Sequence, residues 1–214
     1  DDERAHLHDL VRLTRDGMAA GPRGSGGRGI RPGVRRIIDG MTTMPALLRN
    51  RRLDILHANA LGRALHAEVY EGGSGPPNPA RYVFLDPRSR TFYVDWDRAA
   101  NDMAALLRSE VARSRDDAAL AALIDELMSG SADFRRRWAA HDVLFHRHGT
   151  ASFRHPVVGL LVLSYEDLDL PTDRDQTVLV FTAEPGSASA EALSRLAATA
   201  PQPRDTDEGD GSPG

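Results

Sequence analysis

Two aromatic side chains, an arginine and a histidine share one face of a helix expected in the second half of the chain. Phe134, Arg137, Trp138 and His141 follow one another at i, i+3, i+4 and i+7, which places them on the same side of a helix. Such a face can hold the apolar body of a ligand against the rings while Arg137 pairs with a carboxylate. The ordinary alternative is that Arg137 extends to water and His141 is a hydrogen-bonded core histidine, as most buried polar groups are.

An acyl chain bound at this face would need apolar walls. One wall can come from a helical stripe, and the other from strand residues that follow the helix in sequence. The candidates are Trp96, Met103 and Leu107 from the stripe and Phe153, Leu161, Leu163 and Phe181 from the strands. Protein interiors are normally filled to crystal-like density, so an ordinary packed core remains open as the alternative for each of them.

The histidines allow a rival hypothesis, a metal site. His146 and His148 stand at i and i+2 on one strand face, with His141 and His155 nearby in sequence, and imidazoles in that spacing can chelate Zn²⁺ or Ni²⁺. No acidic third ligand stands at a diagnostic spacing, and the chain has no cysteine. We therefore predict no metal and no obligatory cofactor, and keep a histidine-based metal sensor as the weaker alternative.

Motifs of the common enzyme classes are missing from the sequence. It contains no G-x-S-x-G elbow, no H-E-x-x-H and no P-loop. Gly24, Gly26 and Gly29 match G-x-G-x-x-G, but no strand precedes them and a proline- and arginine-rich stretch surrounds them, so nucleotide binding is not expected. All the basic residues are arginine, which removes lysine chemistry such as a Schiff base. The sequence predicts a binding protein and not an enzyme.

The charge pattern gives no general attraction to nucleic acid or to an anionic membrane. The net charge is −4, and the arginine clusters at 35–36, 49–52 and 135–137 have acids interspersed around them. There is no run of about eighteen apolar residues and no signal-peptide core, so a soluble, cytoplasmic protein without membrane contact is expected.

Helical periodicity predicts a series of helices. Apolar residues recur at helical spacing in the long segment that begins at Trp96, and Asn59 and Ser131 stand where N-caps are expected. The expected helices cover 33–41, the segment after Asn59, 96–111, 117–128, the segment after Ser131, and 189–197.

Strand patterns surround these helices. Two short strands are expected at 46–48 and 53–57, and two more at 143–148 and 152–155 with a turn at Gly149 and Thr150 between them. Residues 157–165 and 177–181 are apolar on both faces, which predicts two strands inside the sheet. The whole pattern predicts an α+β domain, an antiparallel sheet with helices packed on it.

Composition divides the chain into four parts. Residues 1–15 form a short helix whose apolar surface has no partner nearby in sequence, and 16–33 are a flexible Gly/Pro/Arg linker. The globular domain covers 34–197, and 198–214 are an acidic tail expected to be disordered.

Six segments of the globular part resemble the ligand-binding domain of the MmyB-like transcription regulators. They are LDILHANAL at 53–61, FLDP at 84–87, YVDW at 93–96, FRRRWAAHDV at 134–143, HPVVG at 155–159 and TAEPGS at 182–187. The resemblance runs in order through nearly all of 34–197. It implies a PAS-like sensor domain that follows a helix-turn-helix DNA-binding domain of the Xre type, of which residues 1–15 would be the last helix.

The resemblance also implies a function. A fatty-acid-like or other hydrophobic small molecule would bind the domain and modulate DNA binding, which would itself occur only through the N-terminal domain. We expect a homodimer, because such regulators usually read two half-sites with symmetric subunits. The alternative is a dimerisation module of the same regulator with a filled core and no ligand.

Overall fold

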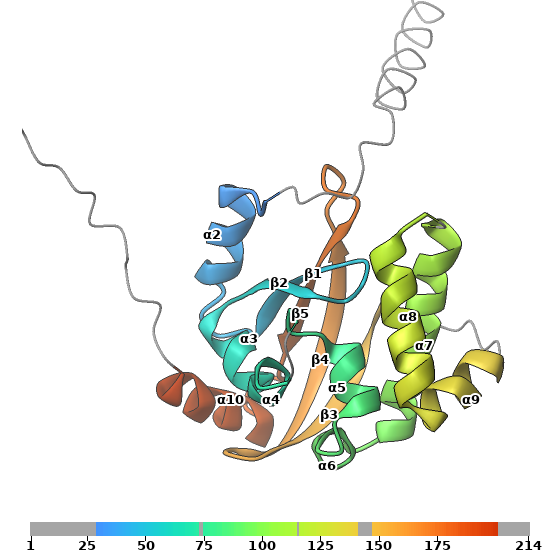
Figure 1. Ribbon diagram of the computed structural model, residues 1–214. Coiled ribbons are helices and arrows are strands. Elements are labelled where there is room, and N and C mark those ends of the chain that lie inside the picture. Colours follow the sequence, from blue (N-terminus) through green and yellow to red (C-terminus); the bar gives the residue numbers. More distant parts are fainter. Residues whose placement is uncertain (1–28, 73–74, 115, 141–146, 201–214) are drawn as a thin grey trace, which may run out of the picture.

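Five antiparallel strands form the central sheet of the computed structural model, which describes residues 29–72, 75–114, 116–140 and 147–200 (Figure 1). Their order across the sheet is β2-β1-β5-β4-β3. The strands are β1 (Ala46–Asn50), β2 (Ile55–Ala58), β3 (His148–His155), β4 (Gly159–Asp169) and β5 (Gln176–Thr182). The α+β class is confirmed, as is the place of β4 and β5 inside the sheet.

Most of the helices join the sheet in one buried apolar cluster. Leu47, Phe153, Leu161 and Phe181 contribute to it from the strands. Its helices are α3 (Ala60–Leu65), α4 (Ala67–Tyr70), α5 (Pro79–Leu85), α6 (Ser89–Phe92), α7 (Trp96–Arg113), α8 (Ala118–Gly130), α9 (Ala132–Ala140) and α10 (Ala188–Thr199). Figure 1 shows α7 and α8 side by side, with α9 next to them.

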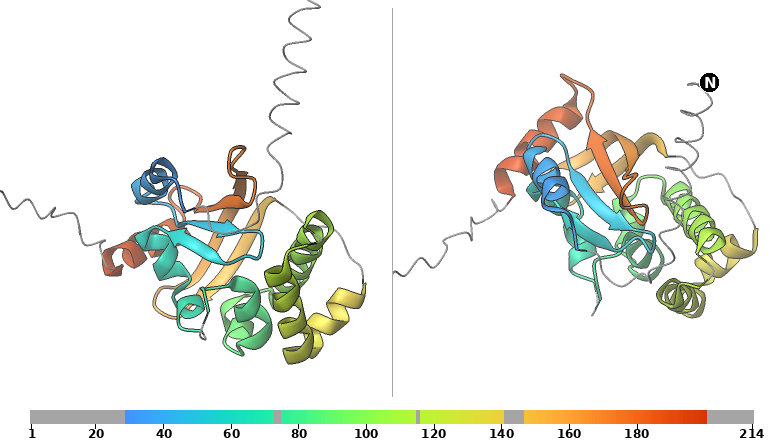
Figure 2. Two further views of the ribbon diagram at one scale, coloured as in Figure 1. Left: turned by 45° about the horizontal axis from the view of Figure 1, so that its top comes forward. Right: turned by 90° about the horizontal axis from the view of Figure 1, so that it is seen from above.

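Helix α2 (Pro32–Gly40) covers the other face of the sheet at β1 and β5. Val34 and Ile38 pack there on Leu48 and Val180 in a second, smaller cluster. Leu47 faces the main cluster and Leu48 the smaller one, as the alternation of side chains along a strand requires. Both views of Figure 2 show α2 over β1 and β2 and apart from α7, α8 and α9.

Asn59 joins the β1–β2 hairpin to α3 and confirms its predicted role as a cap. Its Oδ1 accepts hydrogen bonds from the backbone N of Gly62 at 2.7 Å and of Ala46 at 3.1 Å, and its Nδ2 donates to the Met41 and Met44 carbonyls. A Cβ at Gly62 would lie 2.5 Å from the Ala46 oxygen, so only glycine allows α3 to approach β1 this closely.

The side chains that begin α8 and α9 also lie where the sequence predicts them. Asp117 accepts from the backbone N of Ala119 and Leu120, and the Ser131 hydroxyl accepts from the backbone N of Phe134, all at 3.0–3.1 Å. These caps replace backbone partners that the first turn of a helix lacks.

One prediction about the strands is wrong, and one strand is less buried than its apolar sequence suggests. Gly149 and Thr150 form no turn but lie within β3, where Gly149 pairs with Tyr165 of β4. A Cβ at Gly149 would come within 3.1 Å of the Tyr165 hydroxyl, so this glycine makes room for a ring. β4 is buried on one face only: Leu161 and Leu163 are fully buried, but Leu160 is 58% exposed. The helices of the main cluster cover one face of β3 and β4. On the other face, the buried apolar side chains of α2 pack on β1 and β5, so the described helices leave β4 uncovered there.

The division of the chain into a first helix, a linker, a globular domain and a tail stays a prediction. The predicted helix over 1–15, most of the linker at 16–33 and nearly all of the tail at 198–214 lie outside the described residues, as does most of the strand predicted at 143–148. Within the described part of the chain, no helix combines the length and apolarity that crossing a membrane requires.

Candidate functional site

An apolar pocket of about 120 Å³ lies between α7 and the sheet. Ala99, Met103 and Leu106 line it from α7, spaced three or four residues apart on one helix face. The strands and the neighbouring loops and helices supply the remaining walls: Leu47, Arg49, Leu53, His66, Pro79, Tyr93, Phe153, Tyr165, Asp167, Leu179 and Phe181, with Asp102 from α7. The pocket is thus built from the main core and from the helix that covers it.

A cluster of rings makes one wall of this pocket. Phe153 lies at its centre, with ring centroids 5.1 Å from Phe92, 5.7 Å from Tyr93 and 5.8 Å from Phe181. The edge-to-face and tilted contacts are the arrangements that aromatic rings prefer. Because Phe153 and Phe181 are almost fully buried, the surrounding core holds this wall in place.

His66 is the imidazole of this wall, and it is uncharged. Its Nδ1 lies 3.2 Å from the Gly62 carbonyl oxygen, to which it donates, and its ring centroid is 5.5 Å from that of Phe181. The pKa of His66 is lowered from 6.5 to about 4, and burial is the main cause. The Gly62 carbonyl opposes this shift, and the nearby His155 adds to it. With Nδ1 protonated, Nε2 is a hydrogen-bond acceptor at neutral pH.

A buried ion pair forms part of the wall of the apolar pocket, and also part of the wall of a second, polar pocket. Arg49 Nη2 donates to Asp167 Oδ2 at 2.6 Å, and the two side chains are only 8% and 5% exposed. Burial raises the pKa of Asp167, because the cost of desolvating its charge outweighs the attraction of Arg49. Both residues also line a polar pocket of about 220 Å³ beyond the pair.

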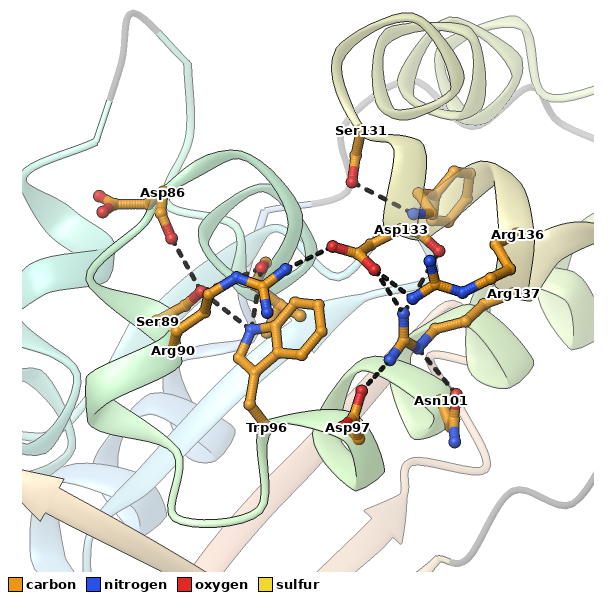
Figure 3. Close-up of polar contacts among 12 residues, drawn as sticks. Asp86, Ser89, Arg90, Trp96, Asp97, Asn101, Ser131, Asp133, Arg136 and Arg137 are labelled. Atoms are coloured by element: carbon orange, nitrogen blue, oxygen red, sulfur yellow. Dashed lines mark hydrogen bonds and ion pairs between the residues drawn. The ribbon is translucent and has the colours of Figure 1, made fainter.

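The helix face singled out by its spacing lies elsewhere, between α9 and the opposite side of α7. Figure 3 shows the Arg137 guanidinium among carboxylate and amide oxygens from both helices. It donates to Asp97, to Asn101 Oδ1 at 2.8 Å and to Asp133 Oδ1 at 3.2 Å, and it lies 4.8 Å from the centroid of the Trp96 ring. Its side chain is 9% exposed, so Arg137 is already held by the protein itself.

The residues proposed from the sequence for ligand binding thus divide into three groups. Met103, Phe153 and Phe181 line the apolar pocket. Trp96, Leu107, Phe134, Leu161 and Leu163 are buried in the core around it without lining it, and Trp138 stacks on Phe134 at 5.2 Å. Arg137 lies in the ion-pair network described above, and His141 lies outside the described residues.

Several pocket residues were not proposed from the sequence. Ala99 and Leu106 could have been found, because they share the helix face of Met103 in a segment expected to be helical. Leu47 and Leu179 could have been found from strand alternation. His66 gave no signal, since a single histidine at the end of a short helix is not distinguishable from a surface residue by spacing.

The histidines proposed as metal ligands do not gather in the part of the chain that the structure describes. No group of three or more histidine, aspartate or glutamate side chains suited to a metal is found among the described residues. His155 is buried and uses both ring nitrogens: Nε2 donates to the Ala64 carbonyl at 3.0 Å, and Nδ1 accepts from the Val157 backbone N at 3.2 Å. His148 is exposed on β3, and His141 and His146 are outside the described residues.

The position of Arg137 leads to a prediction about stability. Arg137→Met is expected to lower the free energy of unfolding by about 1–2 kcal/mol, since it removes hydrogen bonds from a nearly buried guanidinium whose partner Asp97 is itself exposed. Arg136→Met is the matched control: that side chain is 67% exposed and should contribute less than about 0.5 kcal/mol. Urea unfolding of both variants measures the difference, and equal effects would contradict a structural role for Arg137.

Comparison with known families gives one match. The chain matches the family described as MmyB-like transcription regulator ligand binding domain over residues 30–196, from just before α2 to within α10. No curated protein matches the chain.

Proposed function

Because this chain belongs to the family of MmyB-like transcription regulator ligand-binding domains, we propose that its apolar pocket binds a hydrophobic small-molecule effector, with a fatty acid or a similar amphipathic acid as the chemical class. The observation that carries the proposal is the pocket itself. It borders the main core, and its apolar walls come from α7 and from the strands that α7 covers. Binding sites for apolar ligands are typically concave and lined in this way, with a few polar groups.

The volume limits what the pocket can take in this conformation. An engineered apolar cavity of about 150 Å³ holds benzene, so 120 Å³ suits an apolar body of comparable size and not a fully extended long acyl chain. Met103 is the adaptable part of the wall, because a methionine side chain can change rotamer at little cost. We therefore expect short and medium chains to bind first, and longer ones only with displacement of α7 side chains.

Regulation requires that the ligand distinguish two arrangements of the protein. A ligand that binds both equally shifts nothing, however tightly it binds. We propose that occupancy of the pocket changes the packing of α7 on the sheet, and thereby the geometry of a homodimer and of the DNA-binding parts of the regulator, acting in the cytoplasm. Symmetric dimers suit operators with two half-sites.

The pocket can be tested by filling it. Octanoic acid should raise the melting temperature of the wild-type protein. Ala99→Leu places a larger side chain on the α7 face that lines the pocket, and it should abolish this rise. Ala112→Leu, on an exposed position of the same helix, is the control and should keep that rise. The melting temperature without ligand should not fall, because the new side chain enters existing space.

Mass spectrometry of an organic extract from the natively purified protein tests the ligand class directly. A hydrophobic acid at about one equivalent per subunit supports the proposal, and its absence from the extract of the Ala99→Leu variant assigns it to this pocket. A wild-type protein whose melting temperature does not respond to octanoic acid or octanol, and whose extract holds no lipid, would favour the alternative, a dimerisation module with a filled core.

A further inference from the structure

The polar pocket beyond the Arg49–Asp167 pair has a positive charge in an acidic protein. Its walls come from the β1–β2 turn, the last turn of α7 and the segment that joins β4 to β5, and its volume is about 220 Å³. Arginines at 49, 51, 113, 147 and 174 line it, against Glu110, Asp167 and Asp169. Five positive and three negative charges leave two positive ones, whereas the whole chain has a net charge of −4. This lining favours an anionic occupant.

Buried polar atoms without partners also gather at this pocket. Among the described residues, six buried side-chain atoms lack a hydrogen-bond partner, and four of them belong to its lining: Arg49 Nε, Glu110 Oε2, Asp167 Oδ1 and Gln176 Oε1. The Arg49, Asp167 and Gln176 side groups are more than nine-tenths buried. Glu110 Oε2 has only an ion-pair contact, with Arg51 Nε at 3.9 Å. An unpartnered buried donor or acceptor is costly, so these atoms require further polar partners, which water or a ligand in the pocket supplies.

The four atoms differ in what they require. The Nε of Arg49 is a donor and needs an acceptor, which a carboxylate supplies. The three oxygens are acceptors and need donors, which a bare carboxylate does not have. A head group that satisfies both kinds carries an anionic oxygen together with a hydroxyl.

We propose that the polar pocket binds the head group of the effector, and that this head group is a hydroxylated carboxylate. The inference rests on the proposed function, because the apolar part of the same molecule would occupy the neighbouring pocket. The two pockets share Arg49, Leu53, Leu106 and Asp167 in their walls, so they lie next to each other. The proposal requires one molecule to extend from one to the other past the ion pair. The carboxylate faces the arginines, and the hydroxyl donates to Gln176 Oε1.

Three ligands with one chain length separate the contributions: octanol, octanoic acid and β-hydroxyoctanoic acid, each titrated calorimetrically into the full chain. The wild-type protein should bind the hydroxy acid most tightly and the alcohol least tightly. Arg113→Gln combined with Arg147→Gln should weaken both acids about tenfold, which corresponds to about 1.4 kcal/mol, and should change the affinity for octanol less than about twofold. Both arginines are about half exposed, and the Arg147 partner Asp169 is exposed as well. Glu110, the partner of Arg113, is 11% exposed but keeps Arg51 at 3.9 Å, so this variant should fold.

Two further variants complete the test. Arg35→Gln combined with Arg36→Gln removes the same charge from exposed positions of α2 and should leave all three affinities unchanged. Gln176→Leu removes one unpartnered acceptor and should abolish the preference for the hydroxy acid over octanoic acid, while octanoic acid itself still binds.

The outcomes distinguish the two proposals. Equal binding of the acids and the alcohol by the wild-type protein would overturn the head-group site and leave the apolar pocket standing. An equal loss for acids and alcohol in the Arg113 and Arg147 variant would do the same. If none of the three ligands binds the wild-type protein, the proposed function itself fails, and the head-group site fails with it.

Discussion

Arg49→Met is expected to lower the free energy of unfolding by about 3–5 kcal/mol at neutral pH, because it leaves the Asp167 carboxylate buried without its partner. The two groups are 2.6 Å apart and more than nine-tenths buried, so an unpaired Asp167 carboxylate would be left poorly solvated. The pKa of Asp167, already raised by burial, should rise further. Urea unfolding at neutral pH measures this loss.

The pH dependence of that loss has a defined sign. An unpaired Asp167 has a higher pKa in the folded than in the unfolded protein, so the penalty is full above the folded value and vanishes as the pH falls below the unfolded one. Arg49→Met should therefore differ most from wild type at neutral pH and least under acid conditions.

Two control variants show whether burial is the cause. Arg49→Met combined with Asp167→Leu removes both charges and should recover most of the stability, since an apolar pair of similar size is often as stable as a buried ion pair. Arg147→Met disrupts an ion pair whose members are 45% and 55% exposed and should lose less than about 1 kcal/mol. Similar losses for Arg49→Met and Arg147→Met would contradict the account.

Much of the fold could be predicted from local patterns. The stripe that starts at Trp96 predicted α7, and the caps Asn59 and Ser131 predicted where α3 and α9 begin. These elements have long periodic sequences or caps whose chemistry is local, so their neighbours in sequence determine them.

The wrong turn at Gly149 and the one-sided burial of β4 both come from contacts between distant residues. Gly149 was expected in a turn because glycine favours turns, but it lies in β3 because the Tyr165 ring of β4 occupies the space of a side chain. Leu160 and Leu161 have the same apolar character, yet only Leu161 faces the helices. Sequence gives the alternation of a strand, and the length and position of the covering helices decide which face is buried.

The candidate site could be predicted only in part, again because contacts between distant residues determine it. Met103, Phe153 and Phe181 were identified as apolar wall residues, and they line the pocket. Arg137 was proposed as the partner of an acidic ligand because it shares a helix face with Phe134 and Trp138. That face packs on the side of α7 away from the pocket, where Asp97 and Asn101 already bind the guanidinium. Spacing places residues on a face, but it does not say which neighbour the face meets.

The lowered pKa of His66 should make the protein about 3 kcal/mol less stable at pH 4 than at pH 6.5. This loss adds to any change that other titrating groups cause. Its pKa is about 4 in the folded protein, against an ordinary value of 6.5, so the unfolded chain takes up a proton first as the pH falls. The contribution of neutral His66 to the free energy of unfolding is therefore fully present above pH 6.5 and is lost as the pH falls toward 4. Urea unfolding at several pH values between these limits measures the slope.

His66→Gln keeps a donor for the Gly62 carbonyl but does not titrate. It should therefore remove this part of the slope of unfolding free energy against pH, even if it also lowers the stability at neutral pH. His148→Gln, at an exposed position of β3, should leave the slope as in wild type. An unchanged slope in His66→Gln would show that His66 is not buried as described. If the slope is lost, His66 is a neutral acceptor in the wall of the apolar pocket at physiological pH. An acidic head group would then find its charge partners at the arginines of the polar pocket and not at this imidazole.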